Sequence, residues 1–421
     1  MNLLGVLIVA VGIAVSIGWH ELGHLWPAKR FGVKVTQYMI GFGPTIWSRR
    51  RGETEYGFKL IPLGGYIRMI GMFPPASAQQ ERPGRWRTLI ERARAESLAE
   101  VSAEDEQRVF WRLAVRKKLV IMSGGPLMNL LLSAVLFTIA LSVVGQPTPS
   151  QSIKAVVACV PTTENPEGLA GVDGSCSGSE KSFAARYGLR TADKVTAIDG
   201  EPVGSWSDVT TKVRARAGRD VSVSVLRGND ERLTFTGKMT QRTVDGQVVG
   251  FLGTRPQIVY VTRSPGAVPR LMWDTSVASG QALLQLPAST WQLAVATIRG
   301  QERQPDGPVS VVGIADVGGQ IAASGESLRD MTGMFLGLLA SINLFLFLFN
   351  LIPLLPLDGG HVAGALWEAS RRSIARLVGK PDPGPVDTAR MLPIAYTVAL
   401  LLLAMSAVVI LADLFNPVSI S

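Results

Sequence analysis

The residues best suited to chemistry are His20, Glu21 and His24, which stand near the start of the chain in the order His-Glu-Leu-Gly-His. Residues four positions apart lie on the same face of a helix. Two imidazoles at that spacing can bind one Zn²⁺, and the glutamate between them can take a proton from a water beside the metal. The pattern therefore predicts a zinc centre with Glu21 as general base. The alternative is a polar contact between two helices.

Asp358 is the candidate for the third protein ligand that a catalytic zinc requires. It is a lone carboxylate after a long apolar run, and Gly359 and Gly360 follow it. Pro353 and Pro356 interrupt a regular helix, and the two glycines allow close approach of the backbone. We therefore expect a turn that presents Asp358 as a ligand.

His361 is the third of only three histidines in the chain. It follows Asp358 closely in the sequence and could bind the metal directly. Because three protein ligands suffice for a catalytic zinc, a structural or supporting role is favoured for His361.

Composition indicates which elements carry these residues. Of 421 residues, 47% are hydrophobic and only 18% are charged, a balance too apolar for an ordinary soluble enzyme of this length. It indicates a membrane protein that carries a soluble domain. The net charge is +9, but no basic patch interleaved with aromatic residues occurs in the sequence, so we expect no nucleic-acid partner.

Four apolar stretches are each near or above the ~20 residues that cross a bilayer. The first lacks a basic start and a cleavage site, so we interpret it as a retained transmembrane helix rather than a signal peptide. Its end carries ionisable residues at membrane depth, which indicate a functional site. The predicted helices are 3–26, 119–144, 334–357 and 391–414.

Positive charges predict how these helices are oriented. Arg and Lys are concentrated in 49–118 and in 371–390, so both segments should face the cytoplasm. The N-terminus, the C-terminal tail 416–421 and the long section 146–330 should then be extracytoplasmic. Within the cytoplasmic part, 76–108 is rich in Arg, Glu and Ala and is predicted to be a mobile or helical insertion.

The extracytoplasmic section contains a predicted compact domain. The sequence predicts turn, strand and turn at 189–200, a helix at 203–216, and strands at 221–225 and 233–235. This order resembles a PDZ domain over roughly 153–258, and PDZ domains bind extended peptides by strand addition. The alternative is a small β-rich domain without a peptide ligand.

Two smaller features lie in the same section. Cys159 and Cys176 are the only cysteines, and in an oxidising compartment a disulfide between them is favoured over two buried thiols. Segment 269–299 has apolar residues at helical spacing with polar interruptions, which predicts an amphipathic helix on the membrane or against the helix bundle.

Together, the His20–Glu21–His24 pattern and Leu357-Asp358-Gly359 resemble the site-2 protease family of intramembrane metalloproteases, which carries HExxH on one transmembrane helix and Leu-Asp-Gly on a later one. The resemblance extends over essentially the whole chain. Within the family, the chain is similar to the bacterial regulator of sigma-E protease type. Some members have two tandem PDZ domains, whereas the space here permits one.

Three further segments carry the resemblance. Residues 123–129, Ser-Gly-Gly-Pro-Leu-Met-Asn, resemble the family's Gly-x-x-x-Asn motif, which implies that Asn129 holds substrate backbone or the developing oxyanion, with assistance from Asn350. For either asparagine, the alternative is a hydrogen bond between helices. Residues 56–66 resemble the membrane-associated β-loop, where Gly64, Gly65 and Tyr66 offer an edge to an unwound substrate strand. Residues 307–309, Gly-Pro-Val, resemble a motif that precedes the third helix.

The implied fold is a polytopic α-helical membrane protein with about four transmembrane helices, a membrane-associated β-loop and an inserted extracytoplasmic β-rich PDZ domain. The expected parts are the first transmembrane helix with the β-loop (1–75), a basic cytoplasmic insertion (76–117), the second transmembrane helix (118–146), the PDZ domain (147–262), an extracytoplasmic amphipathic region (263–332), and the third and fourth helices (333–421).

The implied activity is an intramembrane zinc endopeptidase with one Zn²⁺ per chain, in the inner membrane of a bacterial cell. Its expected partners are the lipid bilayer and single-span membrane proteins, above all anti-sigma factors already cleaved by an extracytoplasmic protease, in a stress response. The PDZ domain would screen substrates by size or by their new C-terminus. Two rival functions are a transporter or channel that uses the intramembrane ionisable residues, and an inactive PDZ scaffold.

Overall fold

The computed structural model describes residues 2–75, 85–162, 165–171, 174–176, 178–228, 231–244, 246–301 and 307–415. The chain forms two compact units, a helical unit of Met1–Val144 and Arg263–Ser421 and a β-rich unit of Gly145–Thr262. Predictions for 76–84 of the insertion and for the tail 416–421 lie outside the described residues.

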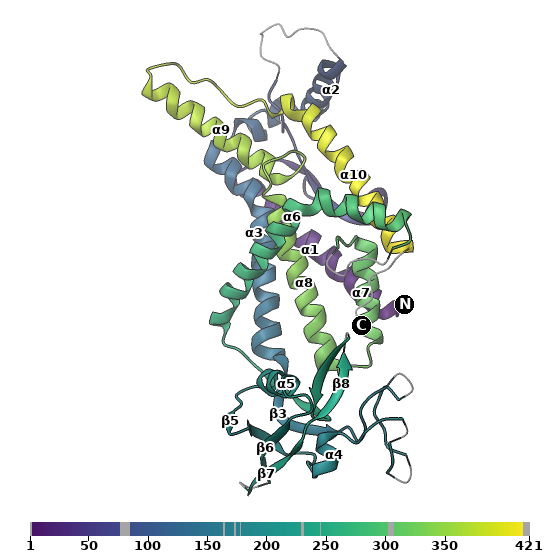
Figure 1. Ribbon diagram of the computed structural model, residues 1–421. Coiled ribbons are helices and arrows are strands. Elements are labelled where there is room, and N and C mark those ends of the chain that lie inside the picture. Colours follow the sequence, from purple (N-terminus) through teal and green to yellow (C-terminus); the bar gives the residue numbers. More distant parts are fainter. Residues whose placement is uncertain are drawn as a thin grey trace. The chain divides into compact units, whose positions relative to one another are not determined.

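Four helices of the helical unit are long and apolar enough to cross a membrane, judged by length and composition over the described residues. They are α1 (Leu3–Arg30), α3 (Val115–Thr138, continued by a π-helix Ile139–Val144), α8 (Leu328–Asn350) and α10 (Leu392–Phe415, after a 3-10 turn Thr388–Met391). In Figure 1, α3 and α8 run alongside one another, and α1 packs on α3.

Small residues allow the helices of this unit to approach closely. At the crossing of α1 and α3, a Cβ added to Gly23 would lie against the Gly124 carbonyl, and one added to Gly124 would lie against the Gly23 carbonyl. Ser133 of α3 donates a hydrogen bond of 2.8 Å to the carbonyl of Ala340 in α8. Close backbone approach of this kind, with polar groups bonded across helices, is typical of packing in membranes.

Strands β1 (Val35–Arg51) and β2 (Thr54–Met69) form a long antiparallel hairpin that folds back on itself. Residues 37–40 pair with 65–68 on one side and with 55–58 on the other, while 48–51 pair with 54–57. Segment 65–69 is therefore an edge of this small sheet. Tyr38 fastens the sheet to α1, since its hydroxyl donates a 2.7 Å hydrogen bond to the Gly18 carbonyl.

The remaining helices of this unit differ in part from the predictions. Helix α6 (Val268–Ile298) forms where an amphipathic helix was expected, and α2 (Arg85–Ala99) lies within the expected insertion. The third long helix ends at Asn350 rather than near 357, because Pro353 cannot donate the helical hydrogen bond. Helices α7 (Val311–Ala323) and α9 (Asp358–Leu377) were not predicted, so 307–309 precede α7 rather than α8 itself.

The β-rich unit is built on an antiparallel sheet in the order β10-β3-β4-β6-β7. Its strands are β3 (Gln146–Val156), β4 (Lys194–Ile198), β6 (Asp220–Arg227), β7 (Glu231–Lys238) and β10 (Thr254–Val261), with β5 (Glu201–Pro202) beside β4. A second pair is β8 (Thr240–Val244) with β9 (Gln247–Phe251), and the helices are α4 (Phe183–Tyr187) and α5 (Trp206–Arg214). β4, β6, β7 and α5 form where the sequence predicted them.

Alternation of side chains builds the core of this unit. Val221, Val223 and Val225 of β6 are buried, as the alternating pattern of a half-buried strand requires. They pack with Phe183 of α4 and Val209 of α5 in one hydrophobic cluster. Cys159 and Cys176 are joined in a disulfide, with their Cα atoms 5.6 Å apart.

Candidate metal centre

Three side chains from two distant segments converge in the helical unit. His20 and His24 lie one turn apart on α1, and Asp358 is the first residue of α9. Asp358 Oδ2 is 3.1 Å from His20 Nε2 and 3.3 Å from His24 Nε2. The two Nε2 atoms are 3.2 Å apart. Three atoms that each offer a lone pair therefore point at one another.

These spacings fit a zinc ion. Bonds of 2.0–2.1 Å in tetrahedral geometry place neighbouring ligand atoms about 3.3–3.4 Å apart, close to the observed distances. Asp358 Oδ2 is buried and has no hydrogen-bond partner among the described residues. A buried carboxylate oxygen without a donor is unfavourable unless a cation accompanies it. The residues present can thus hold a divalent metal ion.

Helix α3 leaves the room that an ion needs. A Cβ added to Gly125 would lie against Nε2 of His24 and 2.7 Å from Nε2 of His20. Any side chain at this position would therefore fill the space between the ligand atoms. This close approach explains why the Gly-x-x-x-Asn motif has glycine at position 125.

The Nδ1 atoms of both histidines, on the side of each ring away from the converging Nε2 atoms, contact residues of α3. His24 Nδ1 is 2.7 Å from the carbonyl oxygen of Ile121. His20 Nδ1 is 3.2 Å from the side-chain amide of Asn129. A hydrogen bond at the second nitrogen fixes the orientation of a metal-binding imidazole.

Glu21 is buried beside the cluster but contributes no atom to it. The edge segment of β2 passes directly over this carboxylate's side chain, because a Cβ added to Gly65 would be 2.9 Å from Glu21 Cγ. A carboxylate next to a metal position and next to a strand edge can exchange protons with a group bound there. Glu21, which the sequence predicts as the base, thus lies beside the three converging side chains.

Asp358 is presented by a helix rather than by an open turn. A Cβ added to Gly359 would lie against the carbonyls of Leu351 and Ile352, and one added to Gly360 would be 2.6 Å from the Leu355 nitrogen. The two glycines therefore let the loop after α8 fold onto the first turn of α9. The N-terminal end of a helix also favours a carboxylate electrostatically.

Other predicted residues lie around the centre with different partners. Asn350 is the last residue of α8, and among the described residues no hydrogen bond joins its side chain to the three ligand candidates. His361 does not belong to the convergent group and lines a small pocket with Lys118 and Glu368. Tyr66 stacks on Phe42 with ring centroids 6.2 Å apart. Gly64 adopts φ +109°, where a side chain would be strained.

Two buried polar contacts near the centre were not predicted from the sequence. Asn343 of α8 donates a 2.9 Å hydrogen bond to Ser16, one turn before His20 on α1. Lys118 of α3 and Glu368 of α9 form a buried ion pair of 2.8 Å. Polar residues inside apolar helices are the signal that could have indicated Asn343. For the ion pair, no local pattern exists, since its members are far apart in the sequence.

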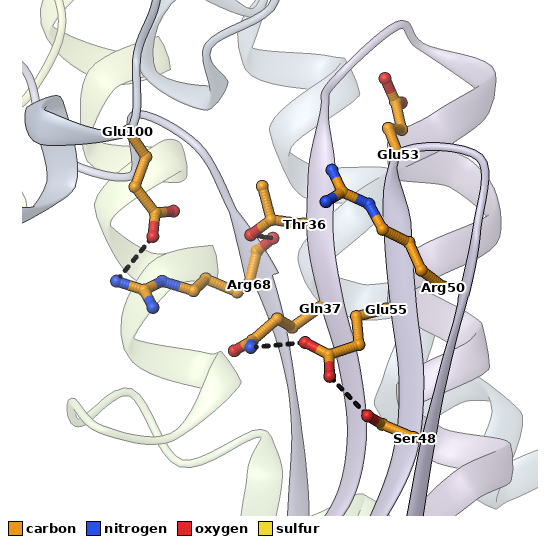
Figure 2. Close-up of a pocket in the computed structure, with 8 residues that line it drawn as sticks. All are labelled: Thr36, Gln37, Ser48, Arg50, Glu53, Glu55, Arg68 and Glu100. Atoms are coloured by element: carbon orange, nitrogen blue, oxygen red, sulfur yellow. Dashed lines mark hydrogen bonds and ion pairs between the residues drawn. The ribbon is translucent and has the colours of Figure 1, made fainter.

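A pocket of about 450 Å³ lies elsewhere, against the β1–β2 hairpin, and contains none of the predicted site residues. Figure 2 shows that three of its charged groups have partners in the pocket: Ser48 and Gln37 donate to Glu55, and Arg68 pairs with Glu100 at 2.9 Å. The hydrogen bonds from Ser48 and Gln37 hold the pKa of Glu55 below its usual range. Since Glu55, Arg68 and Glu100 have these partners, and Glu53 pairs with Arg108 at 2.7 Å, we assign the pocket no chemical role.

The amino-acid sequence of the chain matches a known protein family and several named relatives. Residues 8–380 match the model of peptidase family M50. The chain is 32% identical over 435 residues to "Zinc metalloprotease Rip1" of Mycobacterium tuberculosis, covering 99% of both chains. It is 29% identical to "Zinc metalloprotease RasP" of Geobacillus kaustophilus, covering 84% of this chain and 86% of the relative. It is 25% identical to "Regulator of sigma E protease" of Salmonella typhi, covering 85% and 89%.

The family match covers most of the chain and includes both segments that supply the convergent side chains. It agrees with the resemblance inferred from His20, His24 and Asp358. The chain belongs to peptidase family M50, the site-2 proteases, and is a membrane-embedded zinc metalloprotease.

Proposed function

We propose that this protein is an intramembrane zinc endopeptidase that cleaves single-span membrane proteins, with His20, His24 and Asp358 as the zinc ligands and Glu21 as the base. The observation that carries the proposal is the convergence of three lone-pair atoms at 3.1–3.3 Å beside a buried glutamate. His20, Glu21 and His24 belong to α1, which is long enough to span a bilayer, and Asp358 follows the loop after α8, another such helix.

The residues of the centre have different roles in the proposed hydrolysis. Zinc bound at this site supplies polarisation of the scissile carbonyl and acidification of water. Glu21 takes the proton of the attacking water and later gives it to the leaving amine. His20 and Asp358 are partly accessible, with side chains 12% and 19% exposed, whereas His24 is buried. The open side of the centre therefore lies toward His20 and Asp358.

The edge segment 65–69 is the proposed dock for the substrate. A helical substrate hides its peptide bonds and must unwind before cleavage, and an unwound strand can pair with a free sheet edge. Gly65 lies against Glu21 and Gly64 bends the chain just before the edge. A strand added along Gly64, Gly65 and Tyr66 would bring its backbone next to the base.

We further propose that the β-rich unit is an extracytoplasmic PDZ domain that binds or screens substrates already trimmed outside the membrane. The concentration of Arg and Lys in 49–118 and 371–390 supports a cytoplasmic location for those segments. The disulfide between Cys159 and Cys176 is consistent with an oxidising compartment for this unit. One relative is named for sigma-E regulation, which favours anti-sigma factors as substrates in a bacterial inner membrane.

Replacing Glu21 by Gln tests the proposal. The variant should keep near-stoichiometric zinc, because Glu21 is not a ligand, and should lose cleavage of a co-expressed single-span substrate by about 10²-fold or more. Cleavage would be followed by immunoblot and the cut site by mass spectrometry. Leu22→Ala, an exposed neighbour on α1, is the matched control. Cleavage by Glu21→Gln at the wild-type rate would contradict the protease mechanism and leave the transporter or scaffold functions.

A further inference from the structure

One face of α3 contacts the metal centre although α3 itself, described over its whole length, contributes none of the three ligand atoms. Lys118, Ile121, Gly125 and Asn129 are spaced by three or four residues and therefore lie on one face. We propose that this face positions the zinc ligands and that Asn129 is the positioning residue for His20. In this arrangement the amide oxygen of Asn129 accepts a hydrogen bond from the His20 ring. The inference rests on the proposed assignment of His20 and His24 as ligands.

His24 shows how this face determines which nitrogen is free for the metal. Its Nδ1 is 2.7 Å from the carbonyl oxygen of Ile121, which can only accept a hydrogen bond. Nδ1 must therefore carry the hydrogen. The lone pair of a neutral imidazole is then on Nε2, the atom that faces Asp358 and His20.

His20 has the same requirement and a different partner. Its Nε2 faces the same point as that of His24, at 3.2 Å. For Nε2 to offer a lone pair, Nδ1 must carry the hydrogen and needs an acceptor. The only side chain within hydrogen-bond distance of Nδ1 among the described residues is the amide of Asn129, at 3.2 Å.

An amide can present either of its two ends to the same position, since rotation by 180° exchanges oxygen and nitrogen with no change of shape. Asn129 is 1% exposed, and its Oδ1 has no hydrogen-bond partner in the described structure. The structure places Nδ2 at the contact with His20 Nδ1, and the 180° rotation brings Oδ1 to that position, where it can accept the hydrogen bond. In this orientation the Asn129 amide contacts the Nδ1 side of the His20 ring, away from Nε2 and the metal position. An oxyanion donor would instead have to face the substrate carbonyl at the metal.

Lys118 extends this support to the third ligand. Its ammonium pairs with Glu368 at 2.8 Å, and both side chains are buried. Glu368 lies on α9, the helix that begins with Asp358, and also pairs with Arg372 at 3.0 Å. Thus α3 contacts His20 through Asn129, contacts His24 through Ile121, and holds the helix of Asp358 through Lys118.

Substitutions at Asn129 separate an acceptor role from a donor role. Zinc affinity of the purified full-length protein would be measured by competition with a chelator. Asn129→Ala should weaken zinc binding about 10- to 100-fold, the usual effect of removing the hydrogen-bond partner of a metal-binding histidine. Asn129→Asp keeps only acceptors and should stay within a few-fold of wild type. Asn343→Ala, at a buried asparagine that contacts Ser16 rather than a histidine, is the control and should bind zinc normally.

A spectroscopic measurement gives a second readout that simple misfolding would not reproduce. The chain has three histidines, so labelling with ¹⁵N-histidine yields three sets of imidazole signals in the zinc-loaded protein. Wild type and Asn129→Asp should show His20 with hydrogen on Nδ1. Asn129→Ala should shift the His20 signals and leave those of His24 unchanged, because Ile121 still holds His24.

The outcomes are distinct from those that test the proposed function. Zinc affinity of Asn129→Ala within twofold of wild type would overturn the positioning role. So would loss of cleavage in both Asn129 variants with unchanged zinc affinity, which would instead support an oxyanion donor. Absence of zinc from the wild-type protein, or full activity of Glu21→Gln, would count against the proposed function itself.

Discussion

Two aspartates, one in each unit, differ in what surrounds their carboxylates. Asp193 of the β-rich unit is 1% exposed, and Arg227 donates to both of its oxygens at 2.8 Å while the Arg190 N–H donates to Oδ2 at 2.7 Å. Asp358 of the helical unit faces two imidazole nitrogens, and its Oδ2 lacks a hydrogen-bond partner among the described residues.

The difference separates a carboxylate that stabilises a fold from one that is available for chemistry. Both oxygens of Asp193 accept hydrogen bonds from donors of its own unit, and its charge is paired with Arg227. Asp358 Oδ2 and the two imidazole Nε2 atoms carry lone pairs 3.1–3.3 Å apart, and they repel one another unless a cation lies between them. A buried carboxylate whose partners are acceptors is therefore a stronger sign of a metal site than burial alone.

The largest expected effect follows from removing Asp358. Asp358→Ala should reduce bound zinc to a small fraction and bring cleavage to background. This loss is greater than the decrease in metal affinity of about 10- to 100-fold that is typical when the hydrogen-bond partner of a ligand is removed. Helix content by circular dichroism should remain, because no hydrogen-bond donor among the described residues is paired with this carboxylate. Asp193→Ala should have the opposite effect, with normal zinc and a destabilised β-rich unit. Normal zinc in Asp358→Ala would contradict the ligand assignment.

A single methyl group should have the next largest effect. Gly125→Ala places a Cβ 2.7 Å from His20 Nε2 and against His24 Nε2, so we expect zinc affinity to fall about 100-fold. Gly337→Ala on α8 makes the same change where nothing lies within 4 Å of the added Cβ. This control should bind zinc normally and be slightly more stable, since alanine favours a helix by about 1 kcal/mol. Equal zinc affinity in both variants would exclude crowding at the site.

How far the sequence predicts this site depends on the separation of its parts. His20, Glu21 and His24 are recognisable because their spacing matches one helical face, which is a local property. Asp358 was identified by its isolation after an apolar run and by resemblance to a family. The role of Gly125 depends on where α1 and α3 cross, which no local pattern records.

The fold shows the same division. Long apolar runs and alternating strands were predicted because their periodicity is local. Helices α7 and α9 were not predicted, since both follow prolines and are too short or too amphipathic to stand out as membrane spans. The folding of the hairpin, which places 65–69 at its edge beside Glu21, arises from pairing of residues far apart in the chain.

A smaller effect is expected from the ion pair that saturates Asp193. Arg227→Met leaves that carboxylate with one backbone donor, so the β-rich unit should lose about 2–4 kcal/mol of unfolding free energy. Hydrogen exchange of the full-length protein should show faster exchange in β4 and β6 and unchanged exchange in α1 and α3. Arg232→Met, at an exposed position of β7, is the matched control and should have no effect. Loss of zinc in Arg227→Met would contradict the independence of the two sites.

The smallest effect is a dependence of the β-rich unit on pH. Burial alone would raise the pKa of Asp193, but the hydrogen bonds from Arg227 and from the Arg190 N–H outweigh it and hold the pKa below its usual range. The stability contributed by this carboxylate is therefore complete above the unfolded pKa of about 3.9 and is lost as pH falls through the lower folded value. The midpoint temperature of thermal unfolding of the β-rich unit should thus change little between pH 7 and pH 5 and should fall below about pH 4.

Arg227→Met provides the control. In this variant the part of the decline that is due to Asp193 should weaken, because the folded pKa of Asp193 then lies closer to its unfolded pKa. An equally steep decline in both proteins would assign the acid sensitivity to other carboxylates.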